Sequence, residues 1–294
     1  MIERLKDLWL HRELLFNMTR KELKVKYKRS VLGFLWSFMT PLIMLAVFSL
    51  VFSILSRNKY MSWFVVYLMA GLFPWLFFVN SLTQSVGSVV GNPGLVKKVY
   101  FPREVLTLGA VGANIFHFVM QMLILLIFLL IIGWHFSIYI LYLPLVMLLE
   151  IVFATGLSLF VAAANVYLRD IQHFTDVATM AWFWLTPIVY VIGTVMRFGG
   201  WFKVYLLNPM TNINELYVYI IYNPKHYAPL SYVGGPKISG KFPGVLRLWS
   251  LFKQPPVVYL SFWGILGTIV GSVALLIFGY YYFTVKERGF AEQI

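Results

Sequence analysis

Residues 20–45 read RKELKVKYKRSVLGFLWSFMTPLIML, and the topology of the whole chain can be worked out from them. The first ten carry six positive side chains, and from Gly33 to Leu55 the sequence is almost entirely apolar. Positive residues concentrate on the cytoplasmic side of a bilayer, and a span needs about 20 mainly apolar residues. We therefore expect Arg29 at the cytoplasmic headgroup surface, with the first span directly after it.

The composition is that of a polytopic membrane protein. Of the 294 residues, 60% are hydrophobic and only 12% are charged, whereas a soluble domain is about a quarter charged. The net charge of +13 indicates anionic lipid or an anionic lipid-linked substrate, and no nucleic acid, because the basic residues cluster where the positive-inside rule expects them. The absence of cysteine excludes disulfides, iron–sulfur clusters and thiolate zinc sites.

An all-α integral membrane fold with six transmembrane helices is predicted, as one domain over 1–294. The apolar runs that are long enough to span are 33–56, 62–86, 106–133, 138–164, 175–196 and 258–283. Residues 1–29 are too polar to span and form an N-terminal amphipathic helix, which we expect in the interface plane with Trp9 and Phe16 toward the acyl chains. Gly267 and Gly271 in the last span are spaced for close helix packing.

The distribution of Lys and Arg sets the orientation. With the N-terminus inside, the cytoplasmic segments hold fifteen of these residues, and the two short outer loops hold only Arg57 and Lys59. An even number of spans then places both termini in the cytoplasm, with 284–294 as a cytoplasmic tail. Two cytoplasmic connections carry charge, namely the turn at 87–104 and the linker at 165–176.

The outer segment 197–257 has two different halves. Its first half includes Leu206–Tyr222, which is too apolar for a free loop. We interpret it as a re-entrant helical hairpin between spans five and six, since such backbone is tolerated when it is buried in protein. Its second half, 228–256, is predicted to be an exposed loop or small cap.

No catalytic or metal-binding constellation is found. The sequence GPKISGK at 235–241 has the spacing of a phosphate-binding loop, but Phe242 stands where a Ser or Thr must ligate magnesium, and no strand precedes it. No loop gathers His or carboxylates at metal-ligand spacing. We therefore expect no ATP site, no metal and no cofactor in this chain.

Two titratable residues lie inside predicted spans. Glu150 is a functional candidate because a charge at that depth is costly, and the alternative is that it pairs with a neighbour inside the bundle. His117 is interpreted as a packing residue with one satisfied nitrogen.

Aromatic residues are abundant, with 26 Phe, 18 Tyr and 10 Trp. Aromatic belts at the two membrane interfaces explain many of them, but not those in the middle of a span. Since aromatic faces can stack on the apolar faces of sugar rings, a saccharide translocation path is a second interpretation. Its candidate residues are Trp36, Phe38, Trp75, Phe78, Trp182, Trp184 and Tyr190.

Four motifs stand out along the chain. They are KVKYKRSVLGFLWSFMTPL at 24–42, VYFPREVL at 99–106, VYLRDIQHF at 166–174 and LLNPMTNINELYVYII at 206–221. In order and topological place they resemble the permease subunits of ABC-2 type exporters for O-antigen, capsule and wall teichoic acid. The resemblance covers nearly the whole chain, and 228–256 departs from it by being longer than in most such permeases.

The resemblance implies a transport permease, not an enzyme, in the bacterial cytoplasmic membrane. It implies a homodimer that pairs with two copies of a separate ATP-binding cassette ATPase subunit, which would bind ATP and Mg²⁺. The cargo would be an undecaprenyl-diphosphate-linked polymer moving outward, with wall teichoic acid favoured over O-antigen or capsular polysaccharide.

The resemblance also assigns roles to residues. The coupling helix at 92–104 would dock into the ATPase subunit through Lys97, Lys98, Tyr100, Phe101, Arg103 and Glu104. Tyr167, Arg169 and Asp170 would form a second, smaller contact or a bracket at the membrane surface. The basic block would attract the lipid diphosphate, since each positive side chain gains roughly 1 kcal/mol at an anionic surface, and topology anchoring alone is the alternative. Its residues are Arg20, Lys21, Lys24, Lys26, Lys28 and Arg29.

Three other functions remain open. A membrane transferase for lipid-linked sugars would need clustered acidic residues in loops, which the sequence lacks. A proton-coupled flippase would need several intramembrane carboxylates, and Glu150 stands nearly alone. A type-2 ABC exporter of drugs or lipids would share the fold, although the aromatic residues and the basic block argue mildly against it.

Overall fold

The computed structural model of the chain describes residues 8–26, 30, 32–55, 62–98, 101–134, 136–190, 192, 204–222 and 262–294. Within these ranges the chain forms helices and turns and no strand, which confirms the all-α class. The α-helices are α2 (Arg12–Lys26), α3 (Trp36–Leu55), α4 (Ser62–Val86), α5 (Pro93–Lys98), α6 (Glu104–Ile131), α7 (Leu143–Tyr167), α8 (Ile171–Trp184), α11 (Pro209–Tyr222), α13 (Phe262–Lys286) and α14 (Phe290–Gln293). Short 3-10 helices are η1 (Gly33–Leu35), η2 (Ile138–Tyr142) and η6 (Glu287–Gly289).

A helix lies in each of the six predicted spans. Among the described residues, four helices are long and apolar enough to cross a bilayer, namely α4, α6, η2 with α7, and α13 with the turns that follow it. Helix α3 has 20 residues and is apolar over Trp36–Val51. The apolar runs therefore located the main helices well.

Helix α8 differs from the predicted fifth span at 175–196. It begins four residues earlier, ends twelve residues earlier and has only 14 residues. Pro187 explains the early end, because proline lacks a backbone N–H and disfavours helical geometry at the residue before it. The predicted linker 165–176 is correspondingly short, since only Leu168–Asp170 separate α7 from α8.

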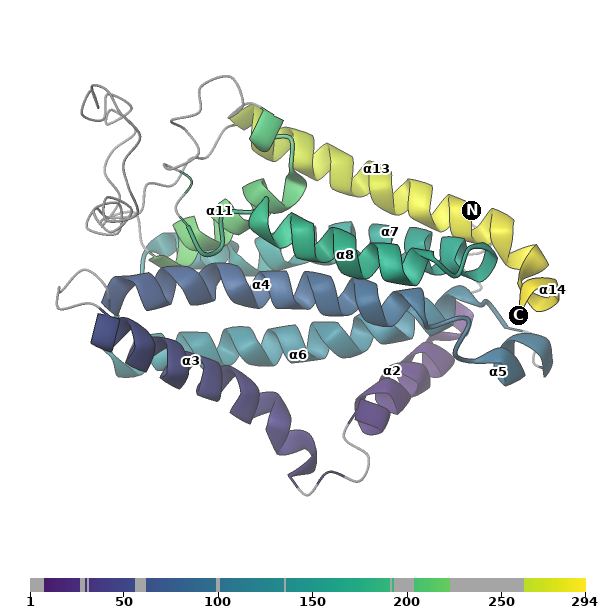
Figure 1. The fold of residues 1–294 in the computed structure, drawn as a ribbon, viewed down its shortest axis with the longest axis horizontal. Coiled ribbons are helices and arrows are strands. Elements are labelled where there is room, and N and C mark those ends of the chain that lie inside the picture. Colours follow the sequence, from purple (N-terminus) through teal and green to yellow (C-terminus); the bar gives the residue numbers. More distant parts are fainter. Residues whose placement is uncertain are drawn as a thin grey trace.

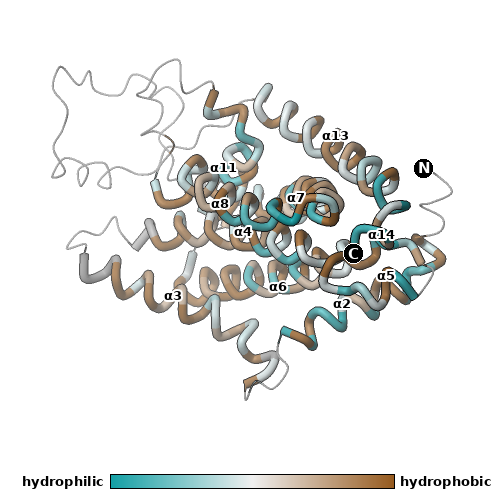
Figure 2. The backbone as a smooth tube through the Cα atoms, turned by 45° about the vertical axis from the view of Figure 1, so that its right-hand side comes forward, coloured by the Kyte–Doolittle hydropathy of each residue, from teal (hydrophilic) through white to brown (hydrophobic). Residues whose placement is uncertain are grey.

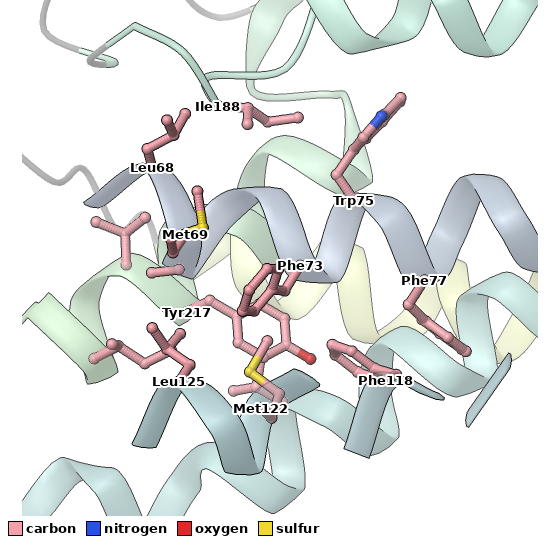
Figure 3. Close-up of a cluster of buried hydrophobic side chains, with 14 of the residues drawn as sticks. Leu68, Met69, Phe73, Trp75, Phe77, Phe118, Met122, Leu125, Ile188 and Tyr217 are labelled. Atoms are coloured by element: carbon pink, nitrogen blue, oxygen red, sulfur yellow. The ribbon is translucent and has the colours of Figure 1, made fainter. Parts of the chain in front are cut away.

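Helix α4 is the centre of the bundle (Figure 1). It packs against α3, α6, α7, α8 and α11. In its apolar stretch 78% is buried inside the chain, whereas in the apolar stretch of α13 only 17% is buried. Figure 3 shows Phe73 beside Tyr217 of α11, and Phe77 beside Phe118 of α6. The rings of Phe77 and Phe118 stack with centroids 4.7 Å apart. These large side chains set the spacing between α4 and its neighbours.

One end of the bundle is more polar than the rest. The helices α5 and α14 and the N-terminus of α8 lie there (Figure 1), and hydrophilic residues gather around α2, α5 and α14 (Figure 2). Beneath them lies a second apolar cluster that includes Val96, Phe101, Phe283 and Phe290. We call this the α5 end.

The closest helix crossing joins α7 to α13. A Cβ added to Gly279 would overlap the carbonyl oxygen of Gly156, and one added to Gly156 would lie 2.6 Å from the amide nitrogen of Leu276. The predicted packing pair, Gly267 and Gly271, is exposed instead, and an added Cβ there would meet no atom of the described chain within 4 Å. Within the described chain, the close glycine contact of α13 is therefore at Gly279, and the packing role of Gly267 and Gly271 stays a prediction.

This crossing predicts that substitutions of two glycines of α13 differ in their effect on stability. Gly279→Val should destabilise the chain by about 1–3 kcal/mol or more, because the added side chain must push α7 and α13 apart. Gly271→Val, the matched control, should leave stability nearly unchanged. The measurement is the thermal unfolding midpoint in mild detergent, and equal midpoints for the two variants would contradict the crossing.

Candidate functional site

Between α4 and α6, the described residues 87–98 and 101–103 include the short helix α5, and we call the connection 87–104 the α5 turn. Asn92 directly precedes α5, and its side-chain amide donates to the backbone carbonyl of Ser88, 2.8 Å away. Val96 is buried in the apolar cluster at the α5 end, whereas Lys97 and Lys98 are exposed. The turn therefore presents two basic side chains from an apolar base.

Two other predicted contact residues of this turn are buried. Phe101 packs into the same apolar cluster as Val96. Glu104 begins α6 and accepts a hydrogen bond from the hydroxyl of Tyr280 on α13, at 3.3 Å. Tyr100 lies outside the described residues. Within the chain, Phe101 and Glu104 attach the α5 turn to its neighbours.

Arg103 also bonds within the chain. Its guanidinium donates to the backbone carbonyl of Glu287, beyond α13, and to that of Val96 in α5, at 3.4 Å. Arg169 and Asp170, by contrast, are exposed where α7 gives way to α8, at the same end of the bundle (Figure 1). The exposed members of the predicted coupling set are therefore Lys97, Lys98, Arg169 and Asp170.

Helix α2 lies across α6 and has two different sides. A Cβ on Gly109 or Gly112 of α6 would come within 2.9 or 2.8 Å of an α2 atom, so the two backbones approach closely. On the other side, Phe16 is exposed, as is Trp9 just before the helix. Their exposure leaves both side chains available for the predicted contact with acyl chains, which stays a prediction.

In the basic block, Lys21 is hydrogen-bonded to another part of the chain, whereas other basic residues are exposed. Lys21 Nζ donates to Oδ1 of Asn92 at 2.6 Å, which ties α2 to the start of the α5 turn. Its neighbour Glu22 accepts a hydrogen bond from Gln84 of α4 at 3.1 Å. The exposed members are Arg20, Lys24 and Lys26, while Lys28 and Arg29 lie outside the described residues.

The aromatic residues of the predicted path occupy three environments. Trp75, Phe78 and Trp182 belong to the apolar core, where the ring of Phe78 lies 5.5 Å from that of Trp75 and 5.1 Å from that of Trp182. Trp36 and Trp184 are exposed on the outside of this chain. Phe38 and Tyr190 are partly buried. A single chain therefore does not bring these seven residues into one lining.

The helix α11 confirms the helical part of the segment Leu206–Tyr222. Eleven of its 14 residues are buried, which is unusual for a connection between spans. Asn214 of α11 donates to the carbonyl of Pro187 at 2.7 Å, and Tyr67 of α4 donates to the same carbonyl at 3.1 Å. These side chains satisfy a backbone carbonyl that lies just beyond the end of α8.

Asn208, just before α11, connects the end of α8 to α11. Its side chain donates to the carbonyl of Leu185 at 2.9 Å and accepts from the indole of Trp182 at 2.8 Å. The side chain of Asn212 donates to Oγ1 of Thr268 on α13, at 3.0 Å. The polar residues of the motif at 206–221 thus bind α11 to three other helices.

Comparison with known proteins identifies the family. The family model of the ABC-2 type transporter matches residues 13–222, which include α2, the α5 turn and α11. The chain belongs to the ABC-2 type transporter family. As members of this family are transport permeases, the membrane-transferase alternative falls away.

Three curated relatives of this ABC-2 chain carry the name O-antigen export system permease protein RfbA. The one from Myxococcus xanthus is 31% identical over 226 residues, which cover 76% of this chain and 85% of the relative. Two from Klebsiella pneumoniae are 32% and 31% identical, over 68% and 76% of this chain and 77% and 86% of the relatives. The ABC-2 assignment therefore rests on most of the chain.

Glu150 of this ABC-2 chain pairs with a neighbour inside the bundle. It is fully buried on α7, and its Oε2 accepts a hydrogen bond from the hydroxyl of Tyr217 on α11, at 2.7 Å. This hydrogen bond is a pairing of the kind that the alternative interpretation expected, and a functional role for Glu150 stays a prediction. His117 is satisfied at one nitrogen as predicted, with Nδ1 lying 3.3 Å from Oγ of Ser37. Among the described residues, no group of three or more His, Asp or Glu is placed to hold a metal ion.

The contact between Glu150 and Tyr217 predicts that removing the hydroxyl of Tyr217 lowers the stability of the fold. Tyr217→Phe should destabilise the fold by about 1–3 kcal/mol, because a buried carboxyl group loses its donor. Glu150→Gln should cost less, since its amide oxygen still accepts from the hydroxyl. Unfolding in mixed micelles of increasing SDS content measures both. Tyr281→Phe, at an exposed position of α13, is the control, and an equal loss there would contradict the pairing.

Proposed function

We propose that the chain is the membrane subunit of an ABC exporter that moves a lipid-linked cell-surface polysaccharide out of the bacterial cytoplasm. The observation that carries the proposal is the similarity to O-antigen export permeases over more than two thirds of the chain. The exposed lysines of the α5 turn support it, because a transporter without its own ATP site needs a surface for the subunit that hydrolyses ATP.

The proposed topology has six spans, with both termini in the cytoplasm. The spans are α3, α4, α6, α7, α8 with the residues that follow it, and α13, while α11 belongs to the re-entrant hairpin at Leu206–Tyr222, in the first half of the outer segment 197–257. The polar α5 end supports this orientation, since it gathers α2, the α5 turn, the N-terminus of α8 and the residues after α13. The α5 end is then cytoplasmic, in agreement with the positive-inside rule. The segment 223–257 lies outside the described residues.

The proposed assembly is a homodimer of this chain with two copies of an ATP-binding cassette ATPase subunit, which binds ATP and Mg²⁺. The exposed position of Trp36 and Trp184 supports a path that forms between two permease chains, because these side chains have no place in the core of one. The cargo is an undecaprenyl-diphosphate-linked polymer. The relatives favour an O-antigen-type polysaccharide, and the earlier preference for wall teichoic acid gains no support from them.

The proposal predicts capture of a specific partner. When the tagged chain is purified from its host in mild detergent, it should bring a stoichiometric subunit with a complete phosphate-binding loop. Lys97→Glu combined with Lys98→Glu should weaken this capture at least tenfold, because the two lysines are the exposed charges of α5.

The control for this capture is Arg12→Glu, an equally exposed reversal on α2. Capture should survive it. A chain that purifies alone and moves lipid-linked sugar in liposomes without ATP would overturn the whole proposal. Undiminished capture by the double lysine variant would remove only the α5 contact.

A second prediction concerns the lipid diphosphate. Arg20→Ala combined with Lys24→Ala should weaken binding of a polyprenyl diphosphate to the permease in nanodiscs by about 30-fold, since each charge contributes roughly 1 kcal/mol. The effect should shrink as salt is added, because these charges are exposed.

Lys97→Ala combined with Lys98→Ala is the matched control for lipid binding. It removes the same charge from the α5 turn and should leave diphosphate affinity unchanged. Equal losses in the two double variants would show that net charge, and no specific site on α2, attracts the lipid.

A further inference from the structure

The chain beyond α13 folds back over the α5 end. Residues Glu287–Ile294, which we call the hook, comprise η6 and α14. Phe290 is fully buried, with its ring 5.3 Å from that of Phe283 and 6.1 Å from that of Tyr167. This burial was hard to predict, because a single aromatic residue in the charged run KERGFAEQ is easily interpreted as part of a tail.

The start of the hook is fixed by Tyr167 at the end of α7. The Tyr167 hydroxyl donates to the carbonyl of Lys286 at 2.7 Å, and the Lys286 ammonium lies 4.9 Å from the centre of the tyrosine ring. A Cβ on Gly289 would come within 2.5 Å of the same hydroxyl, so glycine leaves room for the tyrosine side chain there. The hook is therefore anchored to α7 as well as to α13.

The hook is in direct contact with the α5 turn. Arg103 connects the two, because its guanidinium donates both to the carbonyl of Glu287 in the hook and to that of Val96 in α5. Phe290 also shares one apolar cluster with Val96 and Phe101, and α14 packs against α5.

Helix α5 depends on such support. It has only six residues, and a helix of that length is unstable by itself in water. Its orientation must therefore come from its contacts with the rest of the chain. These are the packing of Val96 in one apolar cluster with Phe290 of the hook, and the hydrogen bond between Lys21 and Asn92.

We propose that the hook positions the α5 turn for contact with the ATPase subunit, with Phe290 and Arg103 as positioning residues. The proposal rests on the proposed function, since it concerns the orientation of the surface that the ATPase subunit binds. Lys97 and Lys98 make the contact, and the hook sets the angle at which they are presented. Phe101 and Glu104 then act in the same way, from inside the turn.

The first test measures the orientation of α5 directly. The chain has no cysteine, so nitroxide labels can be placed at Lys98→Cys and Gln172→Cys, which are both exposed. In the full-length permease in nanodiscs, the distance distribution between the labels should be narrow. Phe290→Ala should broaden it, Phe290→Leu should restore most of the narrow distribution, and Gln293→Ala, at an exposed position of α14, should leave it unchanged.

The second test measures the consequence for the partner. The ATPase subunit that co-purifies with the permease should bind the unlabelled Phe290→Ala variant about tenfold more weakly, and bind Phe290→Leu and Gln293→Ala normally. Arg103→Lys serves as an independent variant, because it keeps the charge, leaves no cavity in the cluster and loses the fork that reaches two carbonyls. It should broaden the distances and weaken binding in the same direction.

The outcomes separate the two proposals. A narrow distance distribution in both Phe290→Ala and Arg103→Lys, or normal binding despite a broadened one, overturns the positioning role of the hook. If the Lys97→Glu, Lys98→Glu variant still loses the ATPase subunit in that case, the α5 contact itself stands. If the double lysine variant binds normally, the α5 contact fails and the positioning role fails with it.

Discussion

Every peptide group that leaves regular helix inside a membrane must find a hydrogen-bond partner within the protein, because the hydrocarbon core offers no water. In the proposed topology, this constraint acts just beyond the end of α8, around Pro187. The carbonyl of Pro187 accepts from both Asn214 and Tyr67, and that of Leu185 accepts from Asn208. Since these donors come from α4 and from the segment of α11, the break in α8 requires both to lie beside it. The central position of α4 and the burial of α11 follow from that requirement.

The sequence predicted the long helices well and the short ones less well. The expected span at 62–86 coincides with α4, because a long apolar run has few alternatives in lipid. The end of α8 was misjudged, since an apolar run continues through Pro187 and hydropathy does not register the missing N–H. The glycine crossing at Gly279 was not predicted, because Gly271 and Gly279 look alike in sequence. Only the position of α7 decides which of them needs to be glycine.

The functional residues show a similar limit. The lysines of α5 were singled out by their charge and by the family resemblance, and both are exposed. For Arg103, however, the sequence does not distinguish a bond to a partner's carboxylate from a bond to a carbonyl of its own chain, and the structure shows the second. Trp75 and Trp182 present the same difficulty, because an aromatic residue in an apolar run suits a packed core as well as a sugar path. What separates these alternatives is the set of neighbours, which comes from contacts distant in sequence.

The α5 turn is the clearest example of such long-range dependence. Its neighbours in sequence are α4 and α6, yet its hydrogen bonds reach Lys21, 71 residues earlier, and Glu287, 184 residues later. Contacts of that separation form only after most of the chain is in place, because closing a long loop costs entropy before the contact rewards it. The surface assigned to the ATPase subunit is therefore completed when α2 and the hook have both docked. A chain that has not finished folding would present α5 without its supports.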